Sequence, residues 1–501
     1  MNWLRWYLLH RMCVFAAAVP AILGSNICLL ATVRFRPTVL RFGRSKGAGR
    51  RIALRHRVHS TPFVRLFNVH CASRETLMNR NSAVALAVFA LGFGTTGMFA
   101  QLNKERGNAP GNVPQVNYFI HQLGTDHVEG ITTIDMNGDG KPDILSGAYW
   151  YENPGPQGGE WKMHQYRTVD ITGEFVSDCG EWAVDVNHDG APDVVTVGWM
   201  TDGLFWYENP KKLGAAWPKH LIAHSIETEG GWMADLNGDG KPELALAHYG
   251  RSGVIWIDFA GPEPKVHHAG GHDQDGHGIG MADIDGDGKV DLLTPHGWFK
   301  NIDANADKWD WHGDWDLEET GFPIVGYDVN NDGKMDLIYS RGHSYGVYWL
   351  EQQGDRSNRT WVKHTIDESF SQVHVLKLVD LDGDGQPELL AGKRYRGHNG
   401  NDPGSYDPLV IYYYKIDRKT GAFTRYAISV NGTAAAGTQF ITEDLDGDGD
   451  LDIATAGKTG VHFFENLKVD KVPKEQREKE LLMNTKSWPF PGEGQNAKWQ
   501  H

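Results

Sequence analysis

The stretch Asp135-Met-Asn137-Gly-Asp139-Gly140-Lys-Pro-Asp143 decides the fold of this 501-residue chain. It offers side-chain oxygens at positions 1, 3, 5 and 9, and the glycine at position 6 allows a sharp turn, as in loops that bind a hard cation. The same pattern returns six times, as Asp185/Asn187/Asp189/Asp193, Asp235/Asn237/Asp239/Glu243, Asp283/Asp285/Asp287/Asp291, Asp328/Asn330/Asp332/Asp336, Asp380/Asp382/Asp384/Glu388 and Asp444/Asp446/Asp448/Asp452. The sequence therefore predicts up to seven structural calcium sites.

The first ligands of successive loops lie 50, 50, 48, 45, 52 and 64 residues apart. Periods of this size mark solenoids and propellers. In each repeat an apolar run enters the loop and a second run leaves it. An aromatic run such as Tyr151-Glu-Asn-Pro154 and a Trp-x-x-His segment such as Trp161/His164 then follow. Four short strands per repeat predict an all-β fold, a seven-bladed β-propeller of four-stranded antiparallel blades over residues 115–466.

The two ends of the repeat region complement each other. The seventh repeat stops after its third strand, at Val461–Asn466, whereas Tyr118–Leu123 stands before the first loop as an isolated strand. We expect the N-terminal strand to complete the last blade and close the ring, because closure removes an open sheet edge. Residues 467–501 are predicted to form a C-terminal tail on the outside.

The first hundred residues differ in composition from the rest. They contain 14 Lys and Arg residues and one acidic residue. Residues 78–100 have a positive start, an apolar centre and a small-residue end, and so predict a signal peptide cleaved before Gln101. Residues 1–77 are then a basic upstream extension, translated only if Met1 is the start. The alternative makes Met1 the start and Cys13–Val33 a signal anchor. We expect a secreted or periplasmic protein without a membrane span in the mature chain.

Charge and cysteine usage limit the partners and the cross-links. Residues 101–501 carry 35 basic and 63 acidic side chains, which disfavours nucleic acid and anionic membranes as partners. Cys179 is the one cysteine beyond the leader, so this region cannot form an internal disulfide. Bound metal must therefore take the stabilising role that disulfides have in other exported domains. We expect a monomer.

The loops exclude an EF-hand and point to a repeat family. An EF-hand needs Glu at loop position 12. That position holds Ser146, Thr196, Leu246, Thr294, Tyr339, Ala391 and Thr455. With their DxNxDGxxD loops, residues 115–466 resemble the FG-GAP/VCBS repeat family, the calcium-loop blades of integrin α propellers and of many secreted bacterial proteins. This resemblance implies a calcium-stabilised propeller and does not specify an activity.

The opposite face of the propeller is where we expect function. Each loop joins the first strand of a blade to the second, so all seven loops lie on one face. The segments before the first strand and after the second lie on the other face, where the repeat is broken by unlike residues. On the entry side these are His127, Glu181, Trp182, Glu229, Trp232, His277 and His374. On the exit side they are Trp199, His248, Tyr249, His296, Trp298, Arg341, His343, Lys393, Arg394, Arg396, His398 and Lys458.

Two groups at this mouth offer catalytic chemistry. A Gly- and His-rich segment leads to His277, and with His296 and His248 it could bind a transition metal or act as general acid and base. The alternative is that these are ordinary surface or hydrogen-bonding histidines. Lys393 and Arg394 begin an insertion that suits a substrate carboxylate or an enolate. The alternative is a charge-balanced surface loop.

Aromatic residues suggest the ligand class. Flat aromatic faces stack on sugars, although tryptophan also packs blades. The residues predicted to bind the ligand are Trp182, Trp199, Trp232, Trp298, Arg341 and His343. The Glu-Asn-Pro endings, the Trp-x-x-His strands and Gln372-Val-His374 are also similar to the propeller domain of aldos-2-ulose dehydratases. That resemblance implies elimination of water from a keto-sugar, but this chain lacks room for the accompanying cupin domains.

The sequence thus predicts a secreted calcium-binding propeller that binds carbohydrate. As an enzyme it would be a lyase or dehydratase acting on uronides or keto-sugars. His277 or His296 would take the proton next to the carbonyl, and Lys393/Arg394 or a histidine-bound metal would hold the enolate. The alternative is a non-catalytic extracellular binding or adhesion module with a protein partner. Convergence of His248, His277 and His296 would favour catalysis or metal binding.

Overall fold

The computed structural model describes residues 117–467, except 173–174, 200, 202, 225 and 249–252. The predicted upstream extension, signal peptide and C-terminal tail lie outside the described residues. No helix within the described part is long and apolar enough to cross a membrane.

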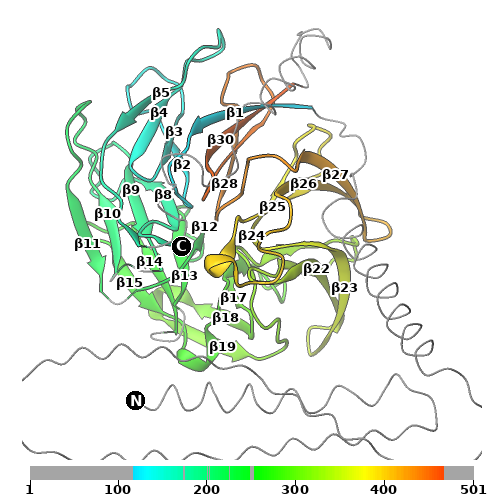
Figure 1. Ribbon diagram of the computed structural model, residues 1–501. Coiled ribbons are helices and arrows are strands. Elements are labelled where there is room, and N and C mark those ends of the chain that lie inside the picture. Colours follow the sequence, from blue (N-terminus) through cyan, green and yellow to red (C-terminus); the bar gives the residue numbers. More distant parts are fainter. Residues whose placement is uncertain are drawn as a thin grey trace, which may run out of the picture. The chain divides into compact units, whose positions relative to one another are not determined.

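The described residues form seven four-stranded antiparallel sheets arranged around a ring, with the first strand of each sheet nearest the centre (Figure 1). The first blade consists of β2 (Thr132–Ile134), β3 (Asp143–Ser146), β4 (Tyr149–Glu152) and β5 (Lys162–Gln165). The second consists of β8 (Gly180–Val184), β9 (Asp193–Val197), β10 (Leu204–Tyr207) and β11 (Lys219–Ala223). The third consists of β12 (Gly231–Ala234), β13 (Glu243–His248), β14 (Gly253–Asp258) and β15 (Lys265–His268). The fourth blade consists of β16 (Gly280–Ala282), β17 (Asp291–Thr294), β18 (Gly297–Asp303) and β19 (Lys308–His312). The fifth consists of β20 (Val325–Tyr327), β21 (Asp336–Ser340), β22 (Tyr345–Asp355) and β23 (Asn358–Ser371). The sixth consists of β24 (Val373–Val379), β25 (Glu388–Lys393), β26 (Val410–Asp417) and β27 (Ala422–Val430).

The seventh blade combines both ends of the described chain. It consists of β28 (Phe440–Glu443), β29 (Asp452–Gly457), β30 (Gly460–Asn466) and, on the outside, β1 (Tyr118–Gly124). In the β1–β30 pair, Tyr118 lies opposite Asn466. The predicted all-β seven-bladed propeller of four-stranded antiparallel blades is confirmed.

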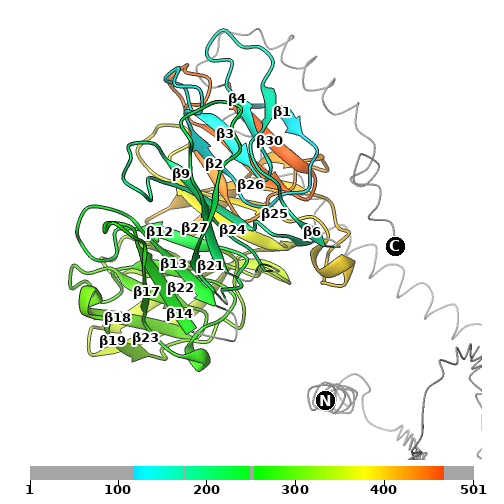
Figure 2. The ribbon, with the colours of Figure 1, turned by 90° about the vertical axis from the view of Figure 1, so that its left-hand side faces the viewer.

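Short elements decorate the ring. A hairpin of β6 (Ile171–Thr172) and β7 (Phe175–Val176) lies between the first two blades in the chain. Three 3-10 turns are η2 (His272–Gln274), η3 (Ala304–Ala306) and η4 (Gly397–Gly400). Figure 2 shows β6 beside the yellow turn η4, and the rings of Phe175 and His398 are 6.5 Å apart.

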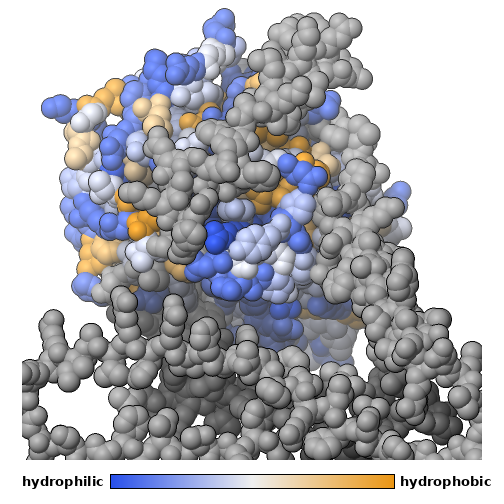
Figure 3. All heavy atoms as spheres, viewed as in Figure 1, coloured by the Kyte–Doolittle hydropathy of each residue, from blue (hydrophilic) through white to orange (hydrophobic). Residues whose placement is uncertain are grey.

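The core lies between neighbouring blades, because the middle strands are covered on both sides. Every residue of β25 and β29 is buried. Each fully buried large apolar side chain stabilises the fold by about 1.5–3 kcal/mol. On the described surface in Figure 3, hydrophilic and hydrophobic side chains are interspersed. The most exposed large apolar side chain except Tyr406 is Leu213, at 56%.

A second repeated feature fixes the outer strands. An aromatic residue of the third strand stacks on a histidine of the fourth, as Trp150 does on His164 at 4.3 Å between ring centroids. The same histidine lies 3.0 Å from a carboxylate oxygen of Glu152. Pairs at matching places include Trp206/His220, Trp298/His312 and Trp349/His364. These histidines therefore belong to blade packing.

The seven predicted metal loops share one hydrogen-bond pattern. In each, the first-position carboxylate accepts a hydrogen bond from the sixth-position glycine N–H at 2.8–3.1 Å. The ninth-position carboxylate accepts one from the second-position N–H at 2.7–3.0 Å. The sixth-position glycines have φ of 82–101°, which only glycine adopts readily.

The ninth-position carboxylates are the feature that suits a cation. Each is at most 2% exposed. Burial raises their pKa values, to about 6 for Asp143 and to about 8 for Asp452. A buried carboxylate without a positive partner is costly, and a divalent ion would offset that cost. In three loops, including Asp444, Asp446 and Asp452, one oxygen from each of three residues lies within 4.8 Å of the others.

The fifth-position aspartates differ from the rest of the predicted ligand set, because they lie exposed at the tips of their loops. In each, Oδ1 accepts a hydrogen bond from the N–H two residues later, at 2.8–3.1 Å. None belongs to the three convergent groups of loop carboxylates. The seven residues are Asp139, Asp189, Asp239, Asp287, Asp332, Asp384 and Asp448.

A carboxylate in such a turn can bond to its own backbone and remain in water. Water screens its charge, so this carboxylate needs a cation less than the buried ninth position does. That the fifth-position aspartates are metal ligands, like the other members of the predicted set, stays a prediction.

Candidate functional site

A cluster of buried polar side chains lies on the face opposite the metal loops. Its members come from four neighbouring positions of the ring. Glu229 precedes β12, His277 precedes β16, His343 follows β21, and His374 lies at the start of β24. All four therefore stand at the entry of a first strand or the exit of a second strand, as expected for the mouth.

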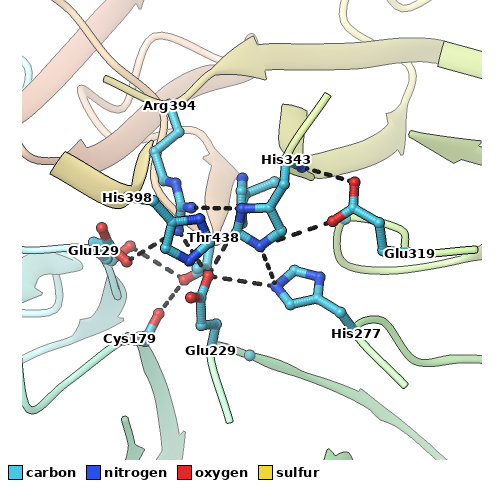
Figure 4. A network of polar contacts seen from close by, with 12 residues as sticks. Glu129, Cys179, Glu229, His277, Glu319, His343, Arg394, His398 and Thr438 are labelled. Atoms are coloured by element: carbon cyan, nitrogen blue, oxygen red, sulfur yellow. Dashed lines mark hydrogen bonds and ion pairs between the residues drawn. The ribbon is translucent and has the colours of Figure 1, made fainter. Parts of the chain in front are cut away.

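The four side chains converge on one point, and Figure 4 shows three of them, Glu229, His277 and His343, pointing toward one another. The Nε2 atoms of His277 and His374 lie 3.4 and 3.3 Å from Oε2 of Glu229. The Nε2 atoms of His343 and His277 are 3.2 Å apart. One ligand atom from each residue lies within 4.8 Å of all the others. Three imidazoles and one carboxylate form a donor set that suits zinc or another divalent transition metal.

The state of the histidines fits a metal. His374 is fully buried, and its Nδ1 makes no hydrogen bond among the described residues. Burial lowers the pKa of His374 well below its usual value, and it also lowers the pKa of His343. Both are therefore neutral, which is the form that binds metals. Burial opposes charge on His277 too, but Glu229 raises its pKa overall.

Glu229 is held as a carboxylate by its neighbours. Burial disfavours its charge, but Arg394, His277 and His374 hold the pKa of Glu229 well below its usual value. An amino group of Arg394 donates to Oε2 of Glu229 at 2.7 Å. Arg394 is 3% exposed and also lies 3.9 Å from Glu129. Its guanidinium thus neutralises the cluster from inside the protein.

The insertion after β25 folds over the cluster. Asp402 accepts a hydrogen bond from Nδ1 of His343 at 3.0 Å, which leaves Nε2 for the cluster. His398 also contacts Asp402 through Nδ1, at 2.9 Å, and its ring stacks on His343 at 4.5 Å. The side chain of His398 is 45% exposed, so this residue lies between the cluster and the solvent.

Lys393 supports that insertion from below. It is fully buried, and its ammonium donates to the carbonyl of Gly404 at 2.8 Å and to Ser371 at 3.3 Å. Burial lowers the pKa of Lys393 to about 8. The structure therefore places Lys393 against the loop rather than at the mouth.

The members of the predicted histidine trio lie in different surroundings where the structure describes them. His277 is in the cluster, whereas Nδ1 of His296 faces Asp316 at 3.1 Å with 38% of its side chain exposed. The side chain of His248 lies outside the described part. His343, predicted as a ligand-binding residue, takes the place among the metal donors that was expected for His296.

The predicted aromatic residues divide into two groups. Trp199 and Trp232 are partly exposed, whereas Trp182 is 8% exposed and packs in a hydrophobic cluster. Trp298 is fully buried and stacks on His312. Its predicted contact with a sugar disagrees with this position. The turn after β17 contains only two residues, so Trp298 already lies inside β18 and faces the core.

Arg341 was also predicted to bind the ligand. Arg341 lies at the mouth, where it donates to Glu318 at 2.8 Å and approaches Glu319 at 3.5 Å. Glu229 and His374 were recognised from the sequence only as mouth residues without a role, and Asp402 as part of the insertion. Their common signal is that they break the repeat immediately before a first strand or inside an extra loop.

A model of the FG-GAP-like repeat matches residues 185–246, 235–294 and 328–391. A search of curated proteins returned no match. Similar solved structures include an Agrocybe aegerita lectin described as recognising non-reducing terminal N-acetylglucosamine, with 17% identity, a TM-score of 0.41, and coverage of 64% of this chain and 92% of the lectin. Another is the Bacillus licheniformis rhamnogalacturonan lyase PL11, with 12% identity, a TM-score of 0.36, and coverage of 70% and 76%. The chain therefore contains three FG-GAP-like repeats within a seven-bladed β-propeller.

Proposed function

We propose that this protein is an exported propeller, stabilised by calcium, that binds a carbohydrate over a transition-metal centre and acts on it as a lyase. The observation that carries the proposal is the convergence of Glu229, His277, His343 and His374 at the mouth. Burial of an ionisable group costs free energy, and buried ionisable groups that do not recur in every blade concentrate at functional sites. The partly exposed Trp199 and Trp232 support a sugar as the ligand.

The metal and the protein would divide the work of elimination. A bound transition metal supplies Lewis acidity toward a carbonyl or carboxylate oxygen. Asp402 holds Nδ1 of His398, which orients this half-exposed imidazole toward a ligand at the mouth. His398 would accept the proton from the carbon next to the carbonyl, in place of the buried His277. The C–O bond at the neighbouring carbon would then break with its electron pair on the leaving oxygen, and His398 would return the proton to that oxygen. Arg394 and Asp402 would keep Glu229 and His343 ready to bind the metal.

A second candidate is a non-catalytic carbohydrate-binding module. It is favoured by the restrained state of Arg341 and Arg394, since both guanidinium groups are already paired with glutamates. In that case the metal would orient the hydroxyl groups of a sugar, and no bond would break.

The experiment combines metal analysis with product detection. The full chain would be assayed for zinc and other transition metals, then incubated with uronides and keto-sugars while the ultraviolet absorbance of an unsaturated product is recorded. Phenanthroline, which binds transition metals in preference to calcium, should abolish product formation. His374→Ala should lose both metal and activity, whereas His296→Gln is the matched control outside the cluster.

The outcomes separate the candidates. Metal that remains after His374→Ala would contradict the assigned centre. Metal at the centre with no product from any substrate, together with binding to an immobilised glycan, would establish the binding module instead. His398→Gln should lower product formation while the metal content stays unchanged.

A further inference from the structure

The seven metal loops are not alike at their third position. Four loops have asparagine there, namely Asn137, Asn187, Asn237 and Asn330. Three have aspartate, namely Asp285, Asp382 and Asp446. The fourth, sixth and seventh blades therefore carry one carboxylate more than the others, and each extra negative charge needs a positive partner or a tightly bound cation.

The fourth blade supplies that partner from its third strand. Lys300 directly precedes Asn301, whose N–H donates to the ninth-position Asp291 at 2.8 Å. At the same place in four other blades stand Glu152, Glu208, Glu351 and Glu465, and each binds the outer-strand histidine. Lys300 instead points into the metal loop, where its ammonium donates to the Oδ2 atoms of Asp285 and Asp287.

The sixth blade repeats this arrangement independently. Lys415 of β26 contacts Oδ2 of Asp382, and it lies 3.0 Å from Asp384 and 3.7 Å from the ninth-position Glu388. Its ammonium therefore faces three of the four predicted ligands of that loop.

These two lysines differ from the others near metal loops. Lys141, Lys211 and Lys334 contact only the fifth-position aspartate of their loops, and their side chains are 35–48% exposed. Lys300 and Lys415 are 21% and 25% exposed. Both ammonium groups thus lie within contact distance of two carboxylates of their ligand sets.

An ammonium in this place competes with calcium. Calcium requires its oxygens at about 2.3–2.6 Å, so it would lie very close to an ammonium bonded to the same oxygens. Like charges at that separation repel strongly, and the partly buried site offers little screening. The seventh blade has the extra Asp446 without such a lysine, since Glu465 there binds His121.

We propose that the ammonium groups of Lys300 and Lys415 are resident cations of their loops, so that the protein takes five calcium ions rather than seven. The five lie in the first, second, third, fifth and seventh blades. The inference rests on the calcium part of the proposed function and is independent of the chemistry at the mouth. It also gives the sequence a rule: aspartate at position 3 with lysine on the third strand marks a loop that needs no metal.

Counting bound calcium tests the proposal. The full chain would be stripped with EGTA, exchanged into excess calcium and measured by native mass spectrometry. The wild-type chain should bind five ions, Lys300→Met and Lys415→Met six each, and the double variant seven. Methionine keeps the length of lysine without its charge. Lys334→Met, which removes an exposed lysine from a loop predicted to bind calcium, should stay at five.

Melting curves give a second measurement. In EGTA, Lys300→Met should melt below the wild-type chain, because its loop has lost the cation closest to Asp285 and Asp287, and calcium should remove the difference. Seven ions on the wild-type chain would overturn the proposal even if the variants do not fold. Folded lysine variants that still bind five would also overturn it. No calcium on any chain would show instead that the calcium part of the proposed function is wrong.

Discussion

The two faces of the propeller arrange their ionisable side chains in opposite ways. On the loop face, seven acidic sets stand at matching places and make the same backbone hydrogen bonds. At the mouth, Glu229, His277, His343 and His374 come from different blades, and no repeat supplies an equivalent set. Residues that recur in every blade stabilise the blade, whereas unlike residues that converge on one point form a single site.

The difference is also energetic. The first-position carboxylate of each loop is held by amides of its own loop, within nine residues. Glu229 depends on Arg394, which is 165 residues away in the chain. Loss of one loop should therefore weaken one blade, whereas loss of one mouth residue should disable the whole cluster without unfolding the ring.

Removal of calcium should have the largest effect, and it should act on stability alone. A ligand at a hundred times its Kd stabilises the native state by about 2.7 kcal/mol per site. Several sites together should shift Tm by roughly 10 °C or more. Melting curves in EGTA and in calcium measure the shift, with magnesium as a control cation that suits these loops less well. An unchanged curve would mean that the loops do not bind calcium.

His374→Ala should break the mouth and spare the fold. Removal of one donor from a four-donor site should weaken transition-metal affinity by about 100-fold or more, since the remaining ligands leave an open position. Competition with a chromophoric chelator measures the affinity, and circular dichroism checks the fold. His164→Gln, which removes a histidine of the repeated outer stack, should leave the affinity unchanged. Equal losses of metal affinity in both variants would show that mouth histidines and outer-strand histidines do not differ in metal binding.

His462 should make the stability depend on pH. His462 of β30 is fully buried, and burial lowers its pKa to about 4. The unfolded chain binds the proton with its ordinary pKa of about 6.5, so this residue costs no stability above that pH. As the pH falls from about 6.5 to 4, stability is lost, by about 2 kcal/mol or more.

His462→Gln should remove that part of the acid sensitivity. Urea unfolding at pH 7 and pH 4.5 measures the difference in free energy between the two conditions. His121→Gln is the control on the partly exposed outer strand. A wild-type-like loss between the two pH values in His462→Gln would show that other groups cause the sensitivity.

Asp402→Asn should have the smallest effect, because the carboxylate acts through another residue. It holds Nδ1 of His343, and loss of such a partner typically weakens metal binding by about 10- to 100-fold. We expect the lower end, since the amide oxygen of asparagine can still accept a hydrogen bond from Nδ1. The affinity measurement used for His374→Ala applies, with Asp316→Asn as the control next to His296. A loss as large as that of His374→Ala would make Asp402 a direct ligand.

Sequence and structure agree wherever the interaction is local. The nine residues of Asp135–Asp143 contain the whole predicted ligand set of one loop, and a period near 50 residues repeats it. Strand alternation and turn residues act over similarly short distances. The sequence by itself therefore determined the blades, their number, the face on which the loops lie and the existence of a mouth opposite.

Only the tertiary structure decided which mouth residues meet. His277 and His343 are 66 residues apart, and their distance depends on the rotation between blades and on the exact ends of the strands. One such end turns Trp298 into the core, and another directs His296 toward Asp316. Likewise, the difference between Lys300 and the glutamates at equivalent places affects the metal loop only because the third strand lies beside that loop in the folded blade. Contacts between blades follow from the closed ring, and no spacing along the chain encodes them.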